Sequence, residues 1–201
     1  MYFFGDTYFQ NFIFKNVFQI VFIIVLITEL AILVFTTWNN KKSSEKKTLS
    51  DRGSMLFIII GFWFAILMNP IFIHITNFML PMYFFWFGIT LTTVGIFIRI
   101  YSVWTLRMYF TLNVQVATEQ KIIKEGPYKY IRHPAYTGSI LTLLGISISF
   151  RSLFGTISSI IIIVLVYGFR IKVEEKVLEK SFGSSYKDYE KQTWRLIPHI
   201  W

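Results

Sequence analysis

The chain is organised around residues 125–136, which read EGPYKYIRHPAY and run directly into an apolar stretch. Gly126 and Pro127 predict a turn, because glycine tolerates positive φ, whereas proline fixes its own φ and keeps the preceding residue out of the helical region. Pro134 predicts the start of a helix, since its missing N–H costs nothing at the first helical position. The stretch therefore marks a place where a polar loop enters an apolar helix.

Arg132 and His133 come directly before this proline. They are expected at the mouth of the apolar helix, among the free backbone donors of its first turn, where an anion can bind. The plainer interpretation is that Arg132 is an anchor whose charge reaches the lipid head groups and that His133 only precedes a helix. These residues alone leave both interpretations open.

The composition indicates an integral membrane protein, because 54% of the 201 residues are hydrophobic and only 15% are charged. The net charge of +9 comes from residues that flank apolar runs, which favours contacts with anionic membrane lipids over nucleic acid. The absence of cysteine excludes disulfides, thiolate metal sites and cysteine nucleophiles. The three histidines lack metal-ligand spacing, so no metal is expected.

The apolar runs predict an all-α, polytopic protein with about five transmembrane helices. Asn69-Pro70 and residues 77–81 are expected to form the turn after the second span, and Arg99 and Arg107 are expected to end the third. The chain between residues 105 and 133 is too polar to cross the membrane. The predicted spans are 17–38, 54–68 or a little beyond, 82–101, and two short ones at 134–150 and 152–169.

Charged residues return after the fifth span, which we expect to continue as a helix to Phe182 and to end at Gly183. Ser185 and Asp188 have the spacing of a capping box, which predicts that a second short helix begins there. Two glycine pairs seven residues apart, at 88 and 95 and at 138 and 145, predict close helix packing, because each pair shares a helix face.

The distribution of Lys and Arg predicts the topology, since cytoplasmic loops carry the excess of positive charge. Segments 41–52, 99–132 and 170–201 hold 18 of the 20 basic residues. We therefore expect an outside N-terminus, a cytoplasmic C-terminus, and one cytosolic cap formed by the 105–133 segment and the C-terminal helices. The first apolar run has no cleavage signal and is expected to be retained. Residues 1–104 are expected to form an N-terminal unit of three spans, and residues 105–201 a catalytic core.

Two groups of charged residues lie within or at the end of predicted spans. Glu29 falls in the middle of the first span, where an ionised carboxylate is costly, so we expect it to face other helices or a polar cavity. Arg170 and Glu174 are one helical turn apart. They can form an intrahelical ion pair, or they can face a carboxylate and an ammonium group of bound ligands.

Three motifs follow one another in the second half of the chain: Gly126-Pro127-Tyr128, Arg132-His133-Pro134-x-Tyr136-x-Gly138 and Arg170-x-x-x-Glu174-Glu175-x-x-Leu178-x-x-x-Phe182-Gly183-x-x-Tyr186-x-x-Tyr189. Together they resemble the isoprenylcysteine carboxyl methyltransferase family. The resemblance covers about 100 residues, and spans one and two lie outside it. It implies a membrane enzyme that uses S-adenosyl-L-methionine from the cytosol and methylates a lipidic substrate entering from the bilayer.

The resemblance also implies roles for single residues. Arg170 is expected to bind substrate, and Arg170 and Glu174 are the expected catalytic pair. Glu174 can hold the ammonium group of the cofactor, His133 and the backbone near Pro134 its carboxylate, and Ile122 and Ile123 its adenine. The implied cofactor contacts are Gln115, Gln120, Lys121, Ile122, Ile123, Tyr128, His133, Pro134, Ala135, Tyr136 and Glu174.

The best expectation for the reaction is carboxyl O-methylation of an isoprenylcysteine-like carboxylate in a prokaryotic cell membrane. Methylation of another membrane lipid, a phenol, an enol or a phospholipid amine, is the alternative on the same scaffold. Two further alternatives are a nicotinamide-dependent enzyme related to sterol reductases, by analogy of fold only, and a non-catalytic lipid-binding protein. Cofactor binding separates these possibilities.

Overall fold

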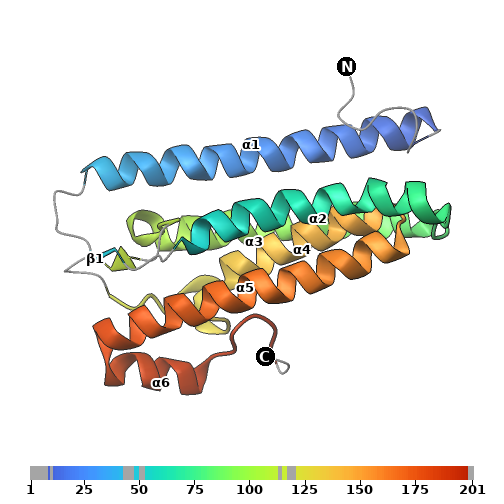
Figure 1. Cartoon of the computed structure of the whole chain (residues 1–201). Coiled ribbons are helices and arrows are strands. Elements are labelled where there is room, and N and C mark those ends of the chain that lie inside the picture. The colour runs from blue at the N-terminus through green and yellow to red at the C-terminus, as the bar shows by residue number, and fades with distance from the viewer. Residues whose placement is uncertain are drawn as a thin grey trace.

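The computed structural model describes residues 9, 11–42, 48, 49, 53–112, 115, 116 and 121–198. Its main elements are long helices that run side by side (Figure 1). In chain order they are α1 (Phe12–Lys42), β1 (Thr48–Leu49), α2 (Ser54–Thr76), α3 (Tyr83–Leu106), the 3-10 helix η1 (Arg107–Tyr109), β2 (Gln115–Val116), the 3-10 helix η2 (Gly126–Lys129), α4 (Pro134–Ser149), α5 (Leu153–Phe182) and α6 (Ser184–Gln192).

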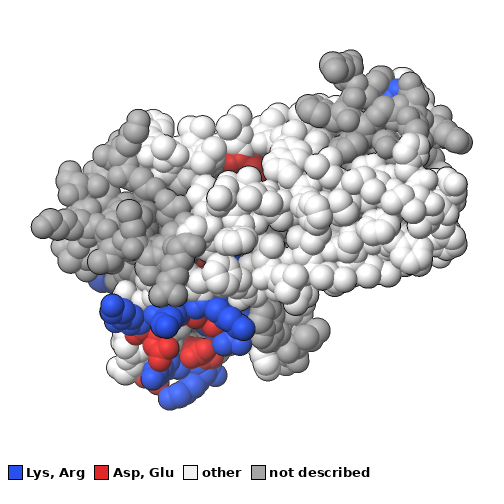
Figure 2. Space-filling model, in the orientation of Figure 1, with Lys and Arg blue, Asp and Glu red and all other residues white. Residues whose placement is uncertain are grey.

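The prediction of an all-α membrane protein is confirmed. Four described helices, α1, α2, α3 and α5, are long and apolar enough to cross a membrane, whereas α4 has only 16 residues. The two short strands pair antiparallel and add only a small ribbon. Many large apolar side chains on the helices point away from the core, as expected for surfaces that face lipid. Charged side chains gather over α6 and the adjoining end of α5, while the helical body is nearly free of them in this view (Figure 2).

The core of the bundle is the contact between α3 and α4, the most extensive in the molecule. A side chain on Gly95 would place its Cβ 2.5 Å from the Thr142 nitrogen, and one on Gly138 would lie 2.8 Å from the Gly95 oxygen. Gly88 and Gly145 meet in the same way. The prediction of close packing at these glycines is thus confirmed, because the two backbones touch where side chains are absent.

The expected break at Asn69-Pro70 is wrong, because α2 continues through both residues to Thr76. Proline removes one backbone donor from the helix, but Asn69 Nδ2 donates to the Ala65 oxygen at 2.9 Å and bonds Ser159 of α5. The helix ends at Asn77, whose φ of 49° is left-handed and whose N–H bonds the Ile73 oxygen at 3.0 Å. The turn therefore lies wholly after residue 76.

Two other predicted boundaries also change. Arg99 does not end the third span, since α3 continues to Leu106 and Arg99 is buried. The capping box at Ser185 is wrong, because α6 begins at Ser184 and Asp188 bonds Lys191 instead. Gly183 accounts for this start: with φ 55° and ψ −125°, it ends α5 as predicted and turns the chain directly into α6.

The segment around η2 and the C-terminal segment pack together at one end of the bundle. The Arg132 backbone nitrogen donates to the Trp194 carbonyl oxygen at 2.7 Å, and the Trp194 backbone nitrogen donates to the Tyr130 carbonyl oxygen at 2.9 Å. The Tyr189 hydroxyl donates to the backbone carbonyl oxygen of Tyr128 at 2.7 Å. We call residues 121–133 and 170–196 the cap. It lies at the end where α3 and α5 finish and α2 begins (Figure 1).

Candidate active site

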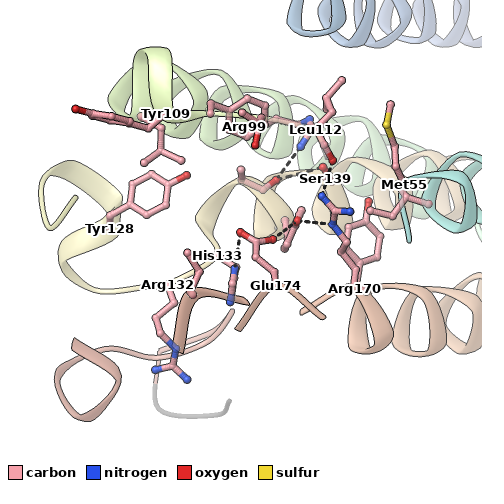
Figure 3. A pocket seen from close by; sticks show the side chains of 18 of the residues that line it. Met55, Arg99, Tyr109, Leu112, Tyr128, Arg132, His133, Ser139, Arg170 and Glu174 are labelled. Atoms are coloured by element: carbon pink, nitrogen blue, oxygen red, sulfur yellow. Dashed lines mark hydrogen bonds and ion pairs between the residues drawn. The ribbon is translucent and has the colours of Figure 1, made fainter. Parts of the chain in front are cut away.

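A cavity of about 450 Å³ lies between the cap and the helical body. One part of its wall is apolar and comes from α1 and α2: Leu30, Leu33, Met55, Ile58, Ile59 and Trp63. The opposite part comes from the cap and includes Lys121, Ile122, Ile123, Tyr128, Tyr186 and Tyr189. Figure 3 shows several polar side chains of the cavity converging on one another. The polar lining residues between the two parts are Glu29, Arg99, His133, Tyr136, Ser139, Tyr167, Arg170 and Glu174.

Tyr136 stands at the centre of this polar group. Pro134 begins α4 as predicted, so Tyr136 lies in its first turn and its ring stacks on His133 with centroids 5.5 Å apart. The Tyr136 hydroxyl accepts a hydrogen bond from Arg170 Nε at 2.8 Å and donates one to Glu174 Oε2. Arg170 and Glu174 are therefore connected through a tyrosine of another helix.

Arg170 is the largest fully buried side chain, with 2% of its surface exposed. Besides Tyr136, its guanidinium donates to Ser54 Oγ and to the Leu112 oxygen, both at 2.5 Å. It thus ties α5 to the start of α2 and to the segment after α3. A buried guanidinium needs such acceptors, since an unpaired charge in a low-dielectric interior is expensive.

Glu174 and Glu175 have different surroundings although they are neighbours. Glu174 faces the cavity, retains 28% side-chain exposure, and lies 3.9 Å from His133 Nδ1. Glu175 lies 3.5 Å from His133 Nε2 and accepts hydrogen bonds from Arg132 and Arg195. Glu174 is consequently able to meet a ligand cation, while Glu175 holds the cap together.

Arg132 belongs to the group around Glu175. Its guanidinium is therefore used within the protein and does not form the expected anion site. Its guanidinium bonds Glu175 and the backbone oxygens of Glu190 and Thr193. Two first-turn donors of α4 are also used, since the Tyr136 and Thr137 backbone nitrogens both donate to the His133 oxygen. The lipid-anchor interpretation fails as well, because Arg132 is buried. Arg132 joins the two segments of the cap.

The structure brings most of the other expected contact residues to the same cavity. Lys121, Ile122, Ile123, Tyr128, Ala135 and Tyr136 line it. Burial raises the pKa of the Tyr128 phenol, with a further contribution from the negative charge of Glu174, so that phenol is protonated at neutral pH. Pro134 shapes the first turn of α4 without lining the cavity. Gln115 lies in β2, with only its backbone described, and Gln120 falls outside the described residues.

The cavity also contains residues that the motifs did not indicate. Ser139 and Tyr167 line it from α4 and α5. Arg99 forms two hydrogen bonds with Glu29, at 2.5 and 2.8 Å, which confirms that Glu29 faces other helices and a cavity. The sequence feature that could have indicated this pair is a carboxylate in the middle of one apolar run together with an arginine inside another.

The sequence profile of the family described as "Phospholipid methyltransferase" matches residues 83–185, which is half of the chain. The chain belongs to this family. The match runs from the start of α3 into α6 and includes Tyr136, Arg170 and Glu174. It confirms the family resemblance seen in the motifs, and it leaves α1 and α2 outside, as those motifs did.

The relatives agree with this assignment. The chain is 26% identical over 116 residues to protein-S-isoprenylcysteine O-methyltransferase B of Arabidopsis thaliana, covering 57% of this chain and 59% of that protein. It is 28% identical over 172 residues to protein-S-isoprenylcysteine O-methyltransferase of Dictyostelium discoideum, covering 82% and 70%. The chain thus spans about three-fifths of the length of the plant relative.

The fold agrees with that of a solved membrane enzyme. The structure of a eukaryotic intramembrane Ras methyltransferase, an isoprenylcysteine carboxyl methyltransferase, superposes with a TM-score of 0.61 at 22% identity. The superposition covers 71% of this chain and 52% of the other. The present chain therefore has this membrane fold.

Proposed function

We propose that the protein is an S-adenosyl-L-methionine-dependent methyltransferase that methylates the carboxylate of an isoprenylcysteine-like lipid. The observation that carries the proposal is the hydrogen-bonded series Glu174–Tyr136–Arg170, which lines the cavity. It offers a carboxylate for a cation and a guanidinium for an anion. An apolar wall beside it fits a lipid chain.

The cap side of the cavity fits the cofactor in chemical type. Glu174 is partly exposed and acidic, which suits the ammonium group of the cofactor. His133 and the Ala135 backbone, which both line the cavity, are the nearby groups for its carboxylate, because the Tyr136 and Thr137 backbone donors are already used. Ile122, Ile123 and Tyr128 supply flat, apolar surface for an adenine. We also keep Lys121, which lines the cavity, and, on the resemblance alone, Gln115 and Gln120.

The membrane side fits a lipid that enters from the bilayer. Leu30, Ile59 and Trp63 line the cavity and are 60%, 45% and 44% exposed. These apolar side chains on α1 and α2 support a path from the bilayer into the cavity. We infer that the acyl or prenyl chain passes between α1 and α2 and brings its polar head to Arg170.

The reaction then requires little of the protein beyond positioning the acceptor carboxylate against the methyl group. When bound, S-adenosyl-L-methionine would supply a methyl group on a positively charged sulfur, which would pass to a carboxylate oxygen of the acceptor and leave a neutral thioether. No proton moves, since the acceptor is already ionised at neutral pH. Arg170 would orient the carboxylate, which replaces Leu112 or Ser54 as its acceptor.

The charge distribution supports our proposal for the orientation in the membrane. The cap and the ends of α1, α3 and α5 lie at one end of the bundle, and this end carries most of the basic side chains. We propose that it faces the cytoplasm of a prokaryotic cell, with residues 105–201 as the catalytic core and residues 1–104 as the N-terminal unit. Cofactor from the cytosol and lipid from the bilayer would then reach the cavity from different sides.

The test is methyl transfer from radiolabelled S-adenosyl-L-methionine by the purified protein in lipid nanodiscs. We expect N-acetyl-S-farnesylcysteine to be labelled as a methyl ester, which releases labelled methanol in base. Base-stable label on phosphatidylethanolamine would instead identify a phospholipid amine as acceptor. Base-stable label on a prenylated phenol would identify a lipid hydroxyl. Binding of a reduced nicotinamide cofactor without S-adenosylhomocysteine binding would overturn the reaction class.

A further inference from the structure

An ion pair inside the helical body has no part in the reaction described above. Glu29 of α1 and Arg99 of α3 share two hydrogen bonds, and Arg99 Nη1 also donates to the Ala135 oxygen at 3.2 Å. Arg99 is 8% exposed. One guanidinium thus connects α1, α3 and the first turn of α4 at the wall of the cavity.

Buried apolar residues flank this pair on both helices. On each helix, the residues about one turn before and after the charged side chain are buried and apolar: Val25 and Ile32 around Glu29, and Ile96 and Val103 around Arg99. The Arg99 side chain is 9% exposed and that of Glu29 is 38% exposed. Removing the Glu29 carboxylate therefore leaves the buried charge of Arg99 without its counter-charge, and the groups around it must shift to meet it.

The third contact of Arg99 reaches the reacting groups through the backbone. Ala135 precedes Tyr136, whose hydroxyl holds Arg170 on one side and Glu174 on the other. The Ala135 carbonyl is also bonded by Ser139 Oγ at 3.2 Å, so it is a fixed point in the first turn of α4. In Figure 3, Arg99 and Ser139 lie between Tyr128 at one side of the cavity and Arg170 at the other.

We propose that Glu29 and Arg99 are positioning residues for the lipid acceptor. By holding the first turn of α4 against α1, they set where the Tyr136 hydroxyl places the Arg170 guanidinium. This inference rests on the proposed function, because it assigns the pair to the acceptor side of that site. The pair lies outside the motifs, and Glu29 lies outside the part of the chain that the family profile matches.

The experiment compares Glu29→Gln, Arg99→Lys and the control Thr36→Val. Thr36 is also buried on α1, but its hydroxyl bonds only within that helix, to Ile32 and Leu33. Each variant is measured for S-adenosylhomocysteine affinity and for the kcat and KM of N-acetyl-S-farnesylcysteine, with activity expressed per cofactor-binding molecule. This normalisation removes any loss that is due only to unfolded protein.

We expect Glu29→Gln and Arg99→Lys to lower kcat/KM at least tenfold while cofactor affinity stays within threefold, and Thr36→Val to match the unmodified protein. Arg99→Lys combined with Tyr136→Phe should be no worse than Tyr136→Phe, because both changes act through the same hydroxyl. Unchanged kcat/KM per binding molecule, or losses that multiply in the double variant, would overturn the inference. Failure of the unmodified protein to bind S-adenosylhomocysteine would count against the proposed function itself.

Discussion

Arg170 Nε donates a hydrogen bond of 2.8 Å to the hydroxyl of Tyr136, and the same hydroxyl donates to Glu174. The two charged residues lie one turn apart on α5, yet the contact between them passes through α4. Among the described contacts, both residues bond Tyr136 and no direct ion pair joins Arg170 to Glu174. The bridge makes the tyrosine hydroxyl the first group to test.

Tyr136→Phe removes this hydroxyl and keeps the ring that packs on His133. We expect a loss of about 1.5–3 kcal/mol, the usual range for a hydrogen bond to a charged group, which corresponds to a ten- to hundredfold lower kcat/KM. Tyr130→Phe is the matched control, because Tyr130 is 60% exposed and lies outside the cavity lining. Equal activity of both variants would show that the bridge does not matter.

His133→Ala and Glu174→Gln should weaken cofactor binding, because both residues are assigned to the amino-acid end of S-adenosyl-L-methionine. The loss of one charge-assisted contact corresponds to about 1.5–3 kcal/mol, or ten- to a hundredfold in affinity. Calorimetric titration with S-adenosylhomocysteine measures the change. If both variants bind as tightly as the unmodified protein, the assignment of the cap side to the cofactor is wrong.

Arg170→Lys tests the chemical class of the acceptor. Lysine keeps the charge but cannot make paired hydrogen bonds to a carboxylate, so we expect most activity to be lost with near-normal cofactor binding. For the unmodified enzyme, the rate should be flat between about pH 6 and 8, because a carboxylate acceptor is already ionised. A rate that rises steeply with pH would indicate a phenol or enol acceptor, whose ionisation creates the nucleophile.

Membrane orientation can be tested with single cysteines, because the chain has none of its own. Ile13 is 59% exposed near the start of α1, and Lys187 lies on the exposed face of α6 at the other end of the bundle. A maleimide that cannot cross the membrane should label Ile13→Cys but not Lys187→Cys in sealed cells. The reverse pattern would place the cap outside and contradict the proposed cytosolic entry of the cofactor.

The glycine contact between α3 and α4 predicts a difference between two alanine substitutions. Gly95→Ala places a methyl group 2.5 Å from the Thr142 nitrogen, so the helices must separate and stability should fall. Gly168→Ala meets no atom within 4 Å and should leave stability equal or raise it by up to about 1 kcal/mol, because alanine favours helix. Thermal denaturation in one detergent compares them. Equal melting temperatures would mean that the helices do not touch there.

The sequence by itself determined the class of fold, the start of α4 at Pro134, the end of α5 at Gly183 and the family, because these depend on local backbone chemistry and on short spacings. It also selected His133, Tyr136, Arg170 and Glu174, which the structure brings to one cavity. Only the tertiary structure decided what each charge contacts. From the sequence, Arg132 could equally have bound an anion, and only the structure shows that it pairs with Glu175.

Long-range packing also overruled several local signals. Pro70 predicts a break, but Asn69 supplies hydrogen bonds within α2 and to α5, so the helix continues. Arg99 looks like the end of a span until Glu29, 70 residues away in the chain, provides its counter-charge. The physical reason is common to both cases: in an apolar interior, a polar group is stable only where a partner meets it, and the partner's position is a property of the fold.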